Sequence, residues 1–138
     1  MFDANEVING LYGFVYDENG KQMQETKAFE TNVGYDKEEV LQAGKLMKGH
    51  KVIAASGSGT ITAHKIDSRL QRKAADNPHA KYNFSAKLKD PTSKGEEYIM
   101  FIGVSFDSAQ LMNFELGELG EIEMDFTFDD FKYLKSIN

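Results

Sequence analysis

The sequence predicts a mainly β fold of two packed antiparallel sheets, a β-sandwich or barrel, with one short α-helix and a long protruding arm. Three observations favour this class. Most segments alternate apolar and polar residues with period two, turn-forming residues separate these segments, and only one short stretch has the features of a helix. The 138 residues suit one domain, because a chain of this size buries about two-thirds of its unfolded surface in one core.

Several segments are predicted to be strands, because they are rich in β-branched and aromatic residues or alternate in polarity. In chain order these segments cover residues 10–16, 22–33, 57–67, 80–88, 98–106 and 120–128. Asn19-Gly20 predicts a hairpin between the first two strands, since a tight type I′ turn favours this pair. Residues 98–106 are apolar on both faces, which is typical of a central strand that is covered on both sides.

The best predicted helix covers residues 69–75. Asp67-Ser68 can cap the free amide groups at its start, and Asn77-Pro78 ends it. Leu70 and Ala74 give this helix only a narrow apolar stripe. A helix of two to three turns is not stable alone, so we expect it to pack against the sheet.

Residues 35–56 follow no clear period, although residues 37–43 could form a helical turn. Structureless connections longer than about 12–15 residues are uncommon in compact domains and usually functional. The candidate contact residues of this arm are Val40, Leu41, Lys45, Leu46, Met47, Lys48, His50, Lys51, Val52 and Ile53. Two interpretations stay open: the arm folds back over its own barrel, or a partner covers its apolar surface.

The stretch from residue 107 to residue 130 is acidic and contains no lysine or arginine. Glu121, Glu123 and Asp125 share one face of the last predicted strand, because side chains on a strand repeat every second residue. Like charges on one face repel each other, so this face should be solvated. It is either an ordinary wet surface or a surface that repels an anion.

Composition and motifs argue against several classes of function. The chain has 16 basic and 22 acidic residues, and a net charge of −6 is unsuited to gripping duplex DNA. It has no cysteine, and its three histidines match no zinc motif. Phosphate-loop, dinucleotide-loop, nucleophile-elbow and calcium-loop patterns each lack a required residue. We therefore expect no enzyme, no cofactor, no metal site and no small-molecule ligand.

The sequence also carries no signal for a membrane. No apolar run is long enough for a spanning helix, and the first residues lack the basic start and apolar stretch of a signal peptide. We therefore expect neither a membrane-spanning helix nor a signal peptide.

Several short motifs, in order along residues 10–131, resemble the tail tube proteins of contractile-tailed phages, PBSX-like defective prophages and phage-tail-like bacteriocins. The pieces that carry the resemblance are Phe29-Glu30-Thr31-Asn32-Val33, Glu39-Val40, Met47-Lys48-Gly49-His50-Lys51, Gly57-Ser58-Gly59-Thr60, Phe106-Asp107-Ser108-Ala109 and Phe126-Thr127-Phe128-Asp129-Asp130-Phe131. Their order and spacing are more specific than any single piece. Residues 70–79 depart from the family pattern because they are more polar.

The resemblance implies one tail-tube domain over residues 1–138, related to the tubes of type VI secretion, with residues 35–56 as a protruding stacking arm. It implies hexameric rings of this chain that stack into a hollow tube. Tail sheath, baseplate and tail terminator proteins are the implied partners, and DNA passes through the tube without specific binding. The implied location is the virion or particle tail, assembled in the bacterial host cytoplasm and released by lysis.

In such a tube we expect Glu121, Glu123 and Asp125 to face the lumen, because an acidic wall does not bind DNA. The rival lining is the polar face of residues 80–88, namely Lys81, Asn83, Ser85 and Lys87. Two other functions stay open: a monomeric β-barrel that binds a small ligand, and a subunit of a type VI secretion-like tube.

Overall fold

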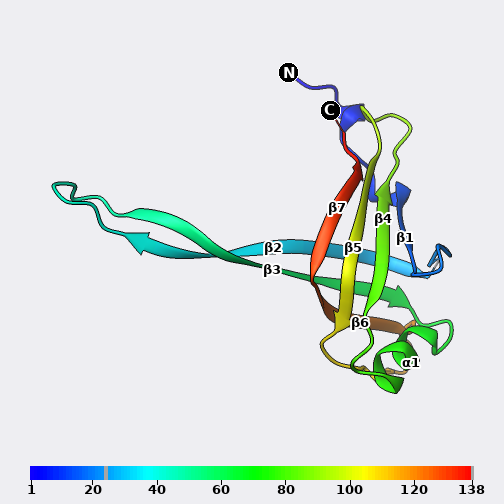
Figure 1. The fold of residues 1–138 in the computed structure, drawn as a ribbon. Coiled ribbons are helices and arrows are strands. Elements are labelled where there is room, and N and C mark those ends of the chain that lie inside the picture. Colours follow the sequence, from blue (N-terminus) through cyan, green and yellow to red (C-terminus); the bar gives the residue numbers. More distant parts are fainter. Residues whose placement is uncertain (24, 138) are drawn as a thin grey trace.

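The computed structural model describes residues 1–23 and 25–137. Its elements, in chain order, are the 3-10 helices η1 (Ala4–Glu6) and η2 (Gly10–Tyr12), the strands β1 (Gly13–Tyr16), β2 (Thr26–Val40) and β3 (Gly49–His64), the helix α1 (Arg69–Asp76), and the strands β4 (Tyr82–Leu88), β5 (Glu97–Phe106), β6 (Glu121–Phe128) and β7 (Asp130–Lys135). The prediction of a mainly β fold with one short α-helix is confirmed (Figure 1).

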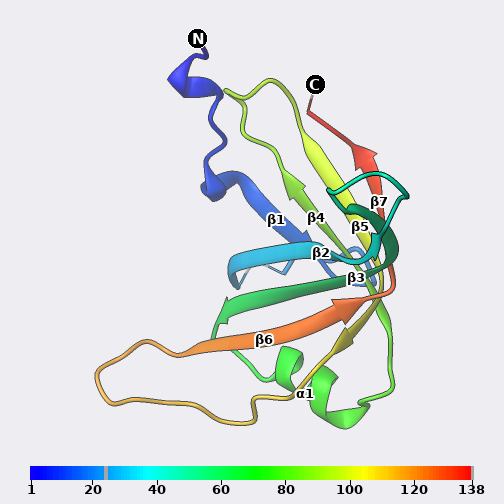
Figure 2. The same ribbon diagram turned by 90° about the vertical axis from the view of Figure 1, so that its left-hand side faces the viewer.

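The strands are joined into one antiparallel sheet, and the predicted detail of two packed sheets is not confirmed. Hydrogen bonds connect them in the order β1-β4-β5-β6-β3-β2, and β7 also pairs with β5. β5 joins the two halves, since it pairs with β4 and β7 over most of its length and with β6 at Ser105 and Phe106. Figure 2 shows the strands β2, β3 and β6 running across the direction of β1, β4 and β5. The prediction that residues 98–106 form a central strand is therefore confirmed.

The core lies between these two halves of the sheet. Its largest fully buried side chains are Phe84, Phe126, Ile61, Met124 and Val104. Phe29 of β2 connects the halves, because its ring centroid lies 5.7 Å from that of Phe101 in β5 and 5.8 Å from that of Phe126 in β6. Burial of a fully enclosed phenylalanine such as Phe84 or Phe126 stabilises the fold by about 1.5–3 kcal/mol.

The helix begins and packs largely as predicted. Asp67 rather than Ser68 supplies the side-chain bond, since Asp67 Oδ1 accepts from the backbone N of Arg69 at 3.1 Å. This bond lowers the pKa of the Asp67 carboxyl. Leu70 and Ala74 are buried, and Gln71 is buried beside them.

The predicted hairpin between the first two strands is wrong. β1 pairs with β4 and β2 pairs with β3, so only the isolated bridge between Tyr16 and Gln22 is left of that pairing. Gly20 has a φ of 77°, but Asn19 does not share a positive φ, so the turn is not type I′. Instead Asp17 Oδ1 accepts from the backbone N of Asn19 and of Lys21, both at 2.9 Å. The chain turns here but then leaves for the other half of the sheet.

The second and third strands are longer than predicted. β2 and β3 take up most of residues 35–56, so the helical turn expected at residues 37–43 is wrong. Period two was hidden in this part because both faces of the hairpin are exposed, and neither face has to be apolar. β7 was not predicted for the same reason, since all of its residues are exposed.

Candidate assembly surfaces

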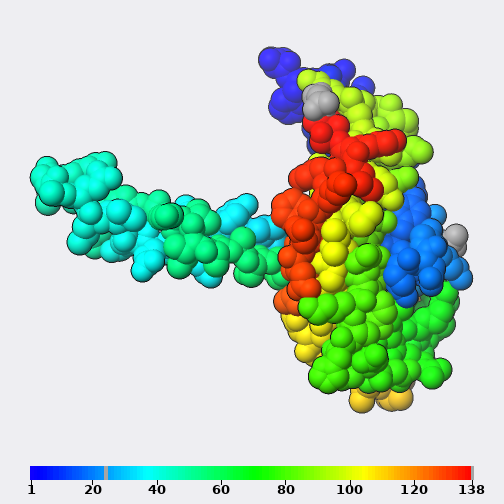
Figure 3. Space-filling model, in the orientation of Figure 1, coloured from blue at the N-terminus to red at the C-terminus, as the bar shows by residue number. Residues whose placement is uncertain are grey.

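The outer part of the β2–β3 hairpin projects from the body as an arm, defined here as residues 35–56 (Figure 1). Its antiparallel register continues to the pair Val40 and Gly49, beyond a bulge at Asp36 and Lys37. Every residue from 34 to 56 is exposed except Gly49. Figure 3 shows the arm standing clear of the rest of the molecule. The arm therefore does not fold back over its own body in this conformation.

The arm exposes a set of large apolar side chains. Leu46 at its tip is 100% exposed, and Leu41 and Met47 are each 76% exposed. The other large apolar residues that the arm exposes are Tyr35, Val40, Val52 and Ile53. The structure thus brings the sequence-predicted contact residues together on one projecting element. Exposed apolar surface of this kind is typical of an interaction site.

The end of the arm is basic as well as apolar. Residues 41–51 contain three lysines and His50 and no acidic residue. Lys48 Nζ lies 3.0 Å from Glu39 Oε2, whereas Lys45 and Lys51 form no ion pair within residues 1–23 and 25–137. These two ammonium groups are available to carboxylates of another molecule.

The acidic residues of β6 lie where period two predicted them. Glu123 and Asp125 are exposed, while the apolar residues between them are buried in the core. Their register partners on β3 are Thr62 and Thr60, so this face of the sheet is polar across two strands. Thr60 Oγ1 donates to Asp125 Oδ1 at 2.7 Å. The face is solvated, and whether it lines a lumen stays a prediction.

Glu121 differs from the other two acidic residues. Its Oε1 accepts a hydrogen bond from Lys27 Nζ of β2, and this bond lowers the pKa of the Glu121 carboxyl. The ammonium group also cancels its charge locally. Glu123 and Asp125 therefore supply the uncompensated negative charge on this part of the sheet.

The side chains of the alternative lumen face, on and next to β4, contact other residues of the same chain. Lys81 Nζ forms an ion pair with Asp129 Oδ2 at 2.6 Å, and Asn83 Oδ1 accepts from the backbone N of Gly103 at 3.3 Å. Lys87 Nζ lies 4.6 Å from the centroid of the Tyr98 ring. The carboxylate of Asp129 thus neutralises Lys81 locally, whereas Lys87 keeps its positive charge over an uncharged ring.

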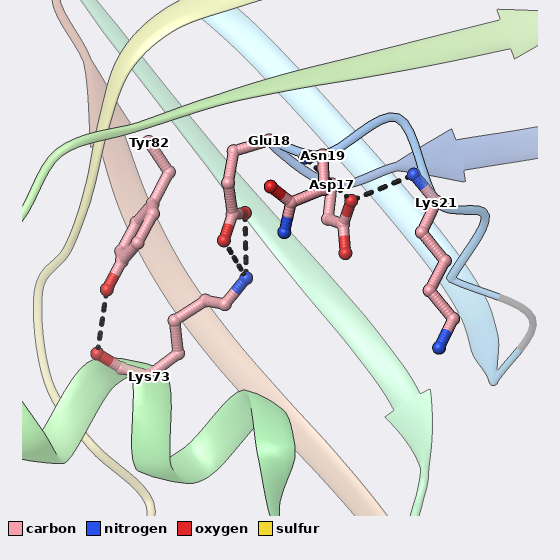
Figure 4. A network of polar contacts seen from close by, with 6 residues as sticks. All are labelled: Asp17, Glu18, Asn19, Lys21, Lys73 and Tyr82. Atoms are coloured by element: carbon pink, nitrogen blue, oxygen red, sulfur yellow. Dashed lines mark hydrogen bonds and ion pairs between the residues drawn. The ribbon is translucent and has the colours of Figure 1, made fainter.

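A polar network joins the first turn to the helix (Figure 4). Lys73 Nζ of α1 lies 2.6 and 2.7 Å from the two carboxylate oxygens of Glu18. The Tyr82 hydroxyl donates to the backbone O of Lys73 at 3.3 Å, and the Lys73 ammonium lies 5.0 Å from the centroid of the Tyr82 ring. The network holds α1 against β4 and the first turn. We interpret it as a contact that stabilises the fold.

The loop between β5 and β6, residues 107–120, was missed by the sequence analysis. It was grouped with the acidic stretch, although its large apolar side chains are strongly exposed. These side chains are Leu111, Met112, Phe114, Leu116 and Leu119. The argument applied to the arm could have found this loop, since it too is a long aperiodic segment rich in apolar residues.

Among residues 1–23 and 25–137, no group of three or more His, Cys, Asp or Glu side chains is arranged to hold a metal ion. Within those residues, no helix has the length and apolar character needed to cross a membrane.

Comparison with known sequences identifies relatives of the whole chain. A family model described as "Phage tail tube protein" matches residues 1–135. The phage-like element PBSX protein XkdM of Bacillus subtilis (strain 168) is 35% identical over 136 residues, which covers 93% of this chain and 90% of that protein. The resemblance inferred from the ordered motifs is therefore confirmed.

Solved structures share the fold at much lower identity. One is a chain of the sheath–tube complex of an extracellular contractile injection system, PVC, in its extended state: the TM-score is 0.73 at 9% identity, covering 99% of this chain and 100% of that chain. Another is a chain from the tube-terminating cap of the anti-feeding prophage, with a TM-score of 0.74 at 8% identity, covering 99% of this chain and 96% of that chain. These structures show a shared fold. By its sequence, this chain belongs to the phage tail tube protein family.

Proposed function

We propose that this chain is a structural subunit whose copies form hexameric rings, and that the rings stack into a hollow tail tube. The tube conducts DNA, or ions in a bacteriocin-like particle, through the target envelope. The observation that carries this proposal is the arm of this tail tube family member. It is an exposed, apolar and basic hairpin that the body does not cover in the described part of the chain. The role is structural rather than enzymatic.

The edges of the sheet support a ring. β1 and β2 stand at the two ends of the strand order, and one edge of the 15-residue strand β2 has no pairing partner among residues 1–23 and 25–137. An open edge of that length invites pairing with another chain, and closure into a ring removes it. Obligate interfaces of this kind bury about 2,000 Å² or more.

The arm supplies the axial contacts between rings. Leu41, Leu46 and Met47 would lose their exposed apolar surface against subunits of the adjacent ring, and this burial contributes about 25 cal/mol per Å². Lys45 and Lys51 pair with acidic groups there. Stacking thus combines apolar burial with charge complementarity that sets the orientation of one ring on the next.

The acidic face of β6 is our candidate for the lumen wall. Duplex DNA carries one negative charge per about 1.7 Å of its length, so a wall that presents Glu123 and Asp125 repels it and does not retain it. Ring symmetry repeats each of these charges around the channel. Passage without specific binding follows from this repulsion.

The remaining partners are those of a tail. Structures with the same fold include chains of a sheath–tube complex and of a tube-terminating cap. We infer that this chain likewise contacts sheath, baseplate and terminator proteins in the particle tail, after assembly in the cytoplasm of the bacterial host.

Removal of the arm tests the proposal. Glu38 and Lys51 are register partners, so residues 39–50 can be replaced by Asn-Gly, which closes a two-residue hairpin without changing the rest of the ladder. We expect negative-stain microscopy of the wild type at high concentration to show rings and tubes, and the shortened variant to show no stacked tubes. Circular dichroism should show that both proteins are folded.

A second variant tests the apolar side chains of the arm without changing its length. Changing Leu41, Leu46 and Met47 to serine keeps the length of the arm and removes its apolar tip, and we expect stacking to be lost here too. Tubes of normal length from the shortened variant, or a wild type that stays monomeric at millimolar concentration, would contradict the proposal. The second result would favour the monomeric ligand-binding barrel.

The lumen assignment has its own test. Glu123→Lys with Asp125→Lys reverses the charge of the candidate wall, and we expect slower DNA ejection from assembled particles, or altered ion leakage if the particle carries no genome. Asp3→Lys with Glu6→Lys is the matched control, since it makes the same change in net charge at the N-terminus. Unchanged transport in the lumen variant would reject the assignment and favour the β4 face.

A further inference from the structure

The loop of residues 107–120 has an exposed apolar end on a fixed base. Phe114 is 77% exposed and Leu116 is 93% exposed, so neither contributes to the core of its own chain. The loop carries Asp107, Glu115 and Glu118 and no basic residue. A single turn shapes its end, in which Gly117 has a φ of 85° and the backbone N of Glu118 donates to the O of Glu115 at 3.1 Å.

The base of the loop is held by a buried side chain. Gln71 of α1 is 5% exposed, and its Nε2 donates to the backbone O of Gln110 at 3.0 Å and of Leu111 at 2.8 Å. Its Oε1 accepts from Lys65 Nζ, so both the nitrogen and the oxygen of its amide have partners. At the other end of the loop, the O of Gly120 accepts from the backbone N of Lys65 at 2.8 Å. Such anchoring limits the conformations of the apolar end and lowers the entropy cost of docking it.

A groove lies at the opposite edge of the molecule. It opens between β1 and the start of β2, the two ends of the strand order, and has a volume of about 790 Å³. Apolar residues that line it include Leu11, Phe29, Leu88 and Ile99. Its ionisable lining consists of Lys27, Lys87, His64 and Glu97. Lys27 is paired with Glu121, whereas Lys87 forms no ion pair within residues 1–23 and 25–137.

We propose that the loop of one subunit docks in the groove of a second copy beside it in the ring, an inference that rests on the proposed function. Both surfaces are apolar, and the Lys87 ammonium at the groove is available to pair with a carboxylate of the acidic loop. The apolar side chains of the loop would fill a groove that no residue of their own chain fills. The same contact, repeated around the ring, buries both surfaces in every subunit.

The positions of loop and groove fit a ring contact. The loop runs along the edge of β6, where the backbone N of Asp107 donates to the O of Asp125 at 2.9 Å and Gln110 Oε1 accepts from the backbone N of Glu123 at 3.3 Å. The groove lies beyond β2, at the other side of the β6–β3–β2 layer. Figure 2 shows this loop on the side of β6 away from β2. Two different patches on opposite edges make a head-to-tail contact, which closes into a ring when the rotation fits.

Crosslinking through introduced thiols tests the contact, because the chain has no cysteine of its own. Leu11 at the groove and Phe114 at the loop are almost equally exposed, at 76% and 77%. We expect the double variant L11C/F114C, assembled and treated with a short bismaleimide, to give a ladder of covalent oligomers on a denaturing gel. Each single variant should give no ladder. The control L11C/L46C has two exposed thiols and should give no ladder within a ring.

A second variant measures the energetic role of the loop. Phe114→Ser with Leu116→Ser removes no buried contact of the monomer, so the chain should fold and keep its unfolding midpoint. We expect the protein concentration needed for ring assembly, measured by analytical ultracentrifugation, to rise by about tenfold or more. Rings that form at the wild-type concentration and give no L11C/F114C ladder would overturn this inference and leave the proposed function standing. A wild type that forms no rings would overturn both.

Discussion

Gly59 of β3 offers a quantitative test of how closely the two halves of the sheet are packed. A Cβ added at this position would lie 2.6 Å from the backbone O of Glu30 and 2.6 Å from Cζ of Phe126. Phe126 is completely buried, and its ring stacks on that of Phe29. Neither the backbone of β2 nor the Phe126 ring can move away without disturbing the core.

We expect Gly59→Ala to destabilise the fold by a net amount of about 1–2 kcal/mol. Overpacking in a tight core costs about 1–3 kcal/mol. The substitution recovers about 0.4–1 kcal/mol, because alanine has less conformational freedom than glycine in the unfolded chain. For a chain of this length, the net loss lowers Tm by about 3–7 °C.

The measurement is urea and thermal unfolding followed by circular dichroism, at a concentration low enough to keep the protein from assembling. Gly10→Ala is the matched control, because a Cβ there meets no atom within 4 Å. The control should be as stable as the wild type or slightly more so. If Gly59→Ala is as stable as Gly10→Ala, the close packing of β3 against Phe126 described above is wrong.

Three further predictions concern side chains that hold the body together. Gln71→Ala leaves two loop carbonyls without a donor; we expect a loss of about 1–3 kcal/mol in urea unfolding and faster proteolysis within residues 107–120. Asp90 accepts from the backbone N of Asn9 and of Thr92, and these bonds lower the pKa of its carboxyl below the usual aspartate range. The ionised Asp90 carboxylate therefore stabilises the fold fully at pH values above the ordinary aspartate range, and this stabilisation is lost as pH falls through the lowered pKa. The difference in unfolding free energy between wild type and Asp90→Asn should shrink on acidification. A difference that stays constant with pH would contradict this. Lys73→Met should cost about 0.5–1 kcal/mol through its partly buried pair with Glu18, whereas Arg72→Met on the same helix, whose pair is exposed, should cost almost nothing.

The sequence predicted best those strands that are half buried. Residues 121–128 alternate in the structure as they do in the sequence, because one face of this strand packs in the core and the other meets solvent. The same rule could not detect the strand structure of the arm, since no face of it is buried within one chain. The arm was recognised instead as an apolar segment without a partner.

The candidate site was predicted in part. Residues 40–53 and 121–125 were singled out from composition and spacing, and the structure places them on a projecting hairpin and on a solvated sheet face. The ion pair between Lys27 and Glu121 could not be foreseen, because the two residues lie far apart in the sequence and meet only when β2, β3 and β6 align. The loop of residues 107–120 was not predicted to be an exposed apolar surface, because only its acidic residues were interpreted.

The sequence alone determined the fold class, the buried and exposed faces of the regular strands, the single helix, and the presence of an apolar arm. These are local properties, because the period of apolar residues follows from which face of an element must leave water. Only the tertiary structure decided that β1 pairs with β4, that β2 and β3 form one long hairpin, and that the loop and the groove lie on opposite edges. Strand pairing uses backbone hydrogen bonds that every residue except proline can make, so the choice of partner depends on how the whole core packs, not on the residues of any one strand.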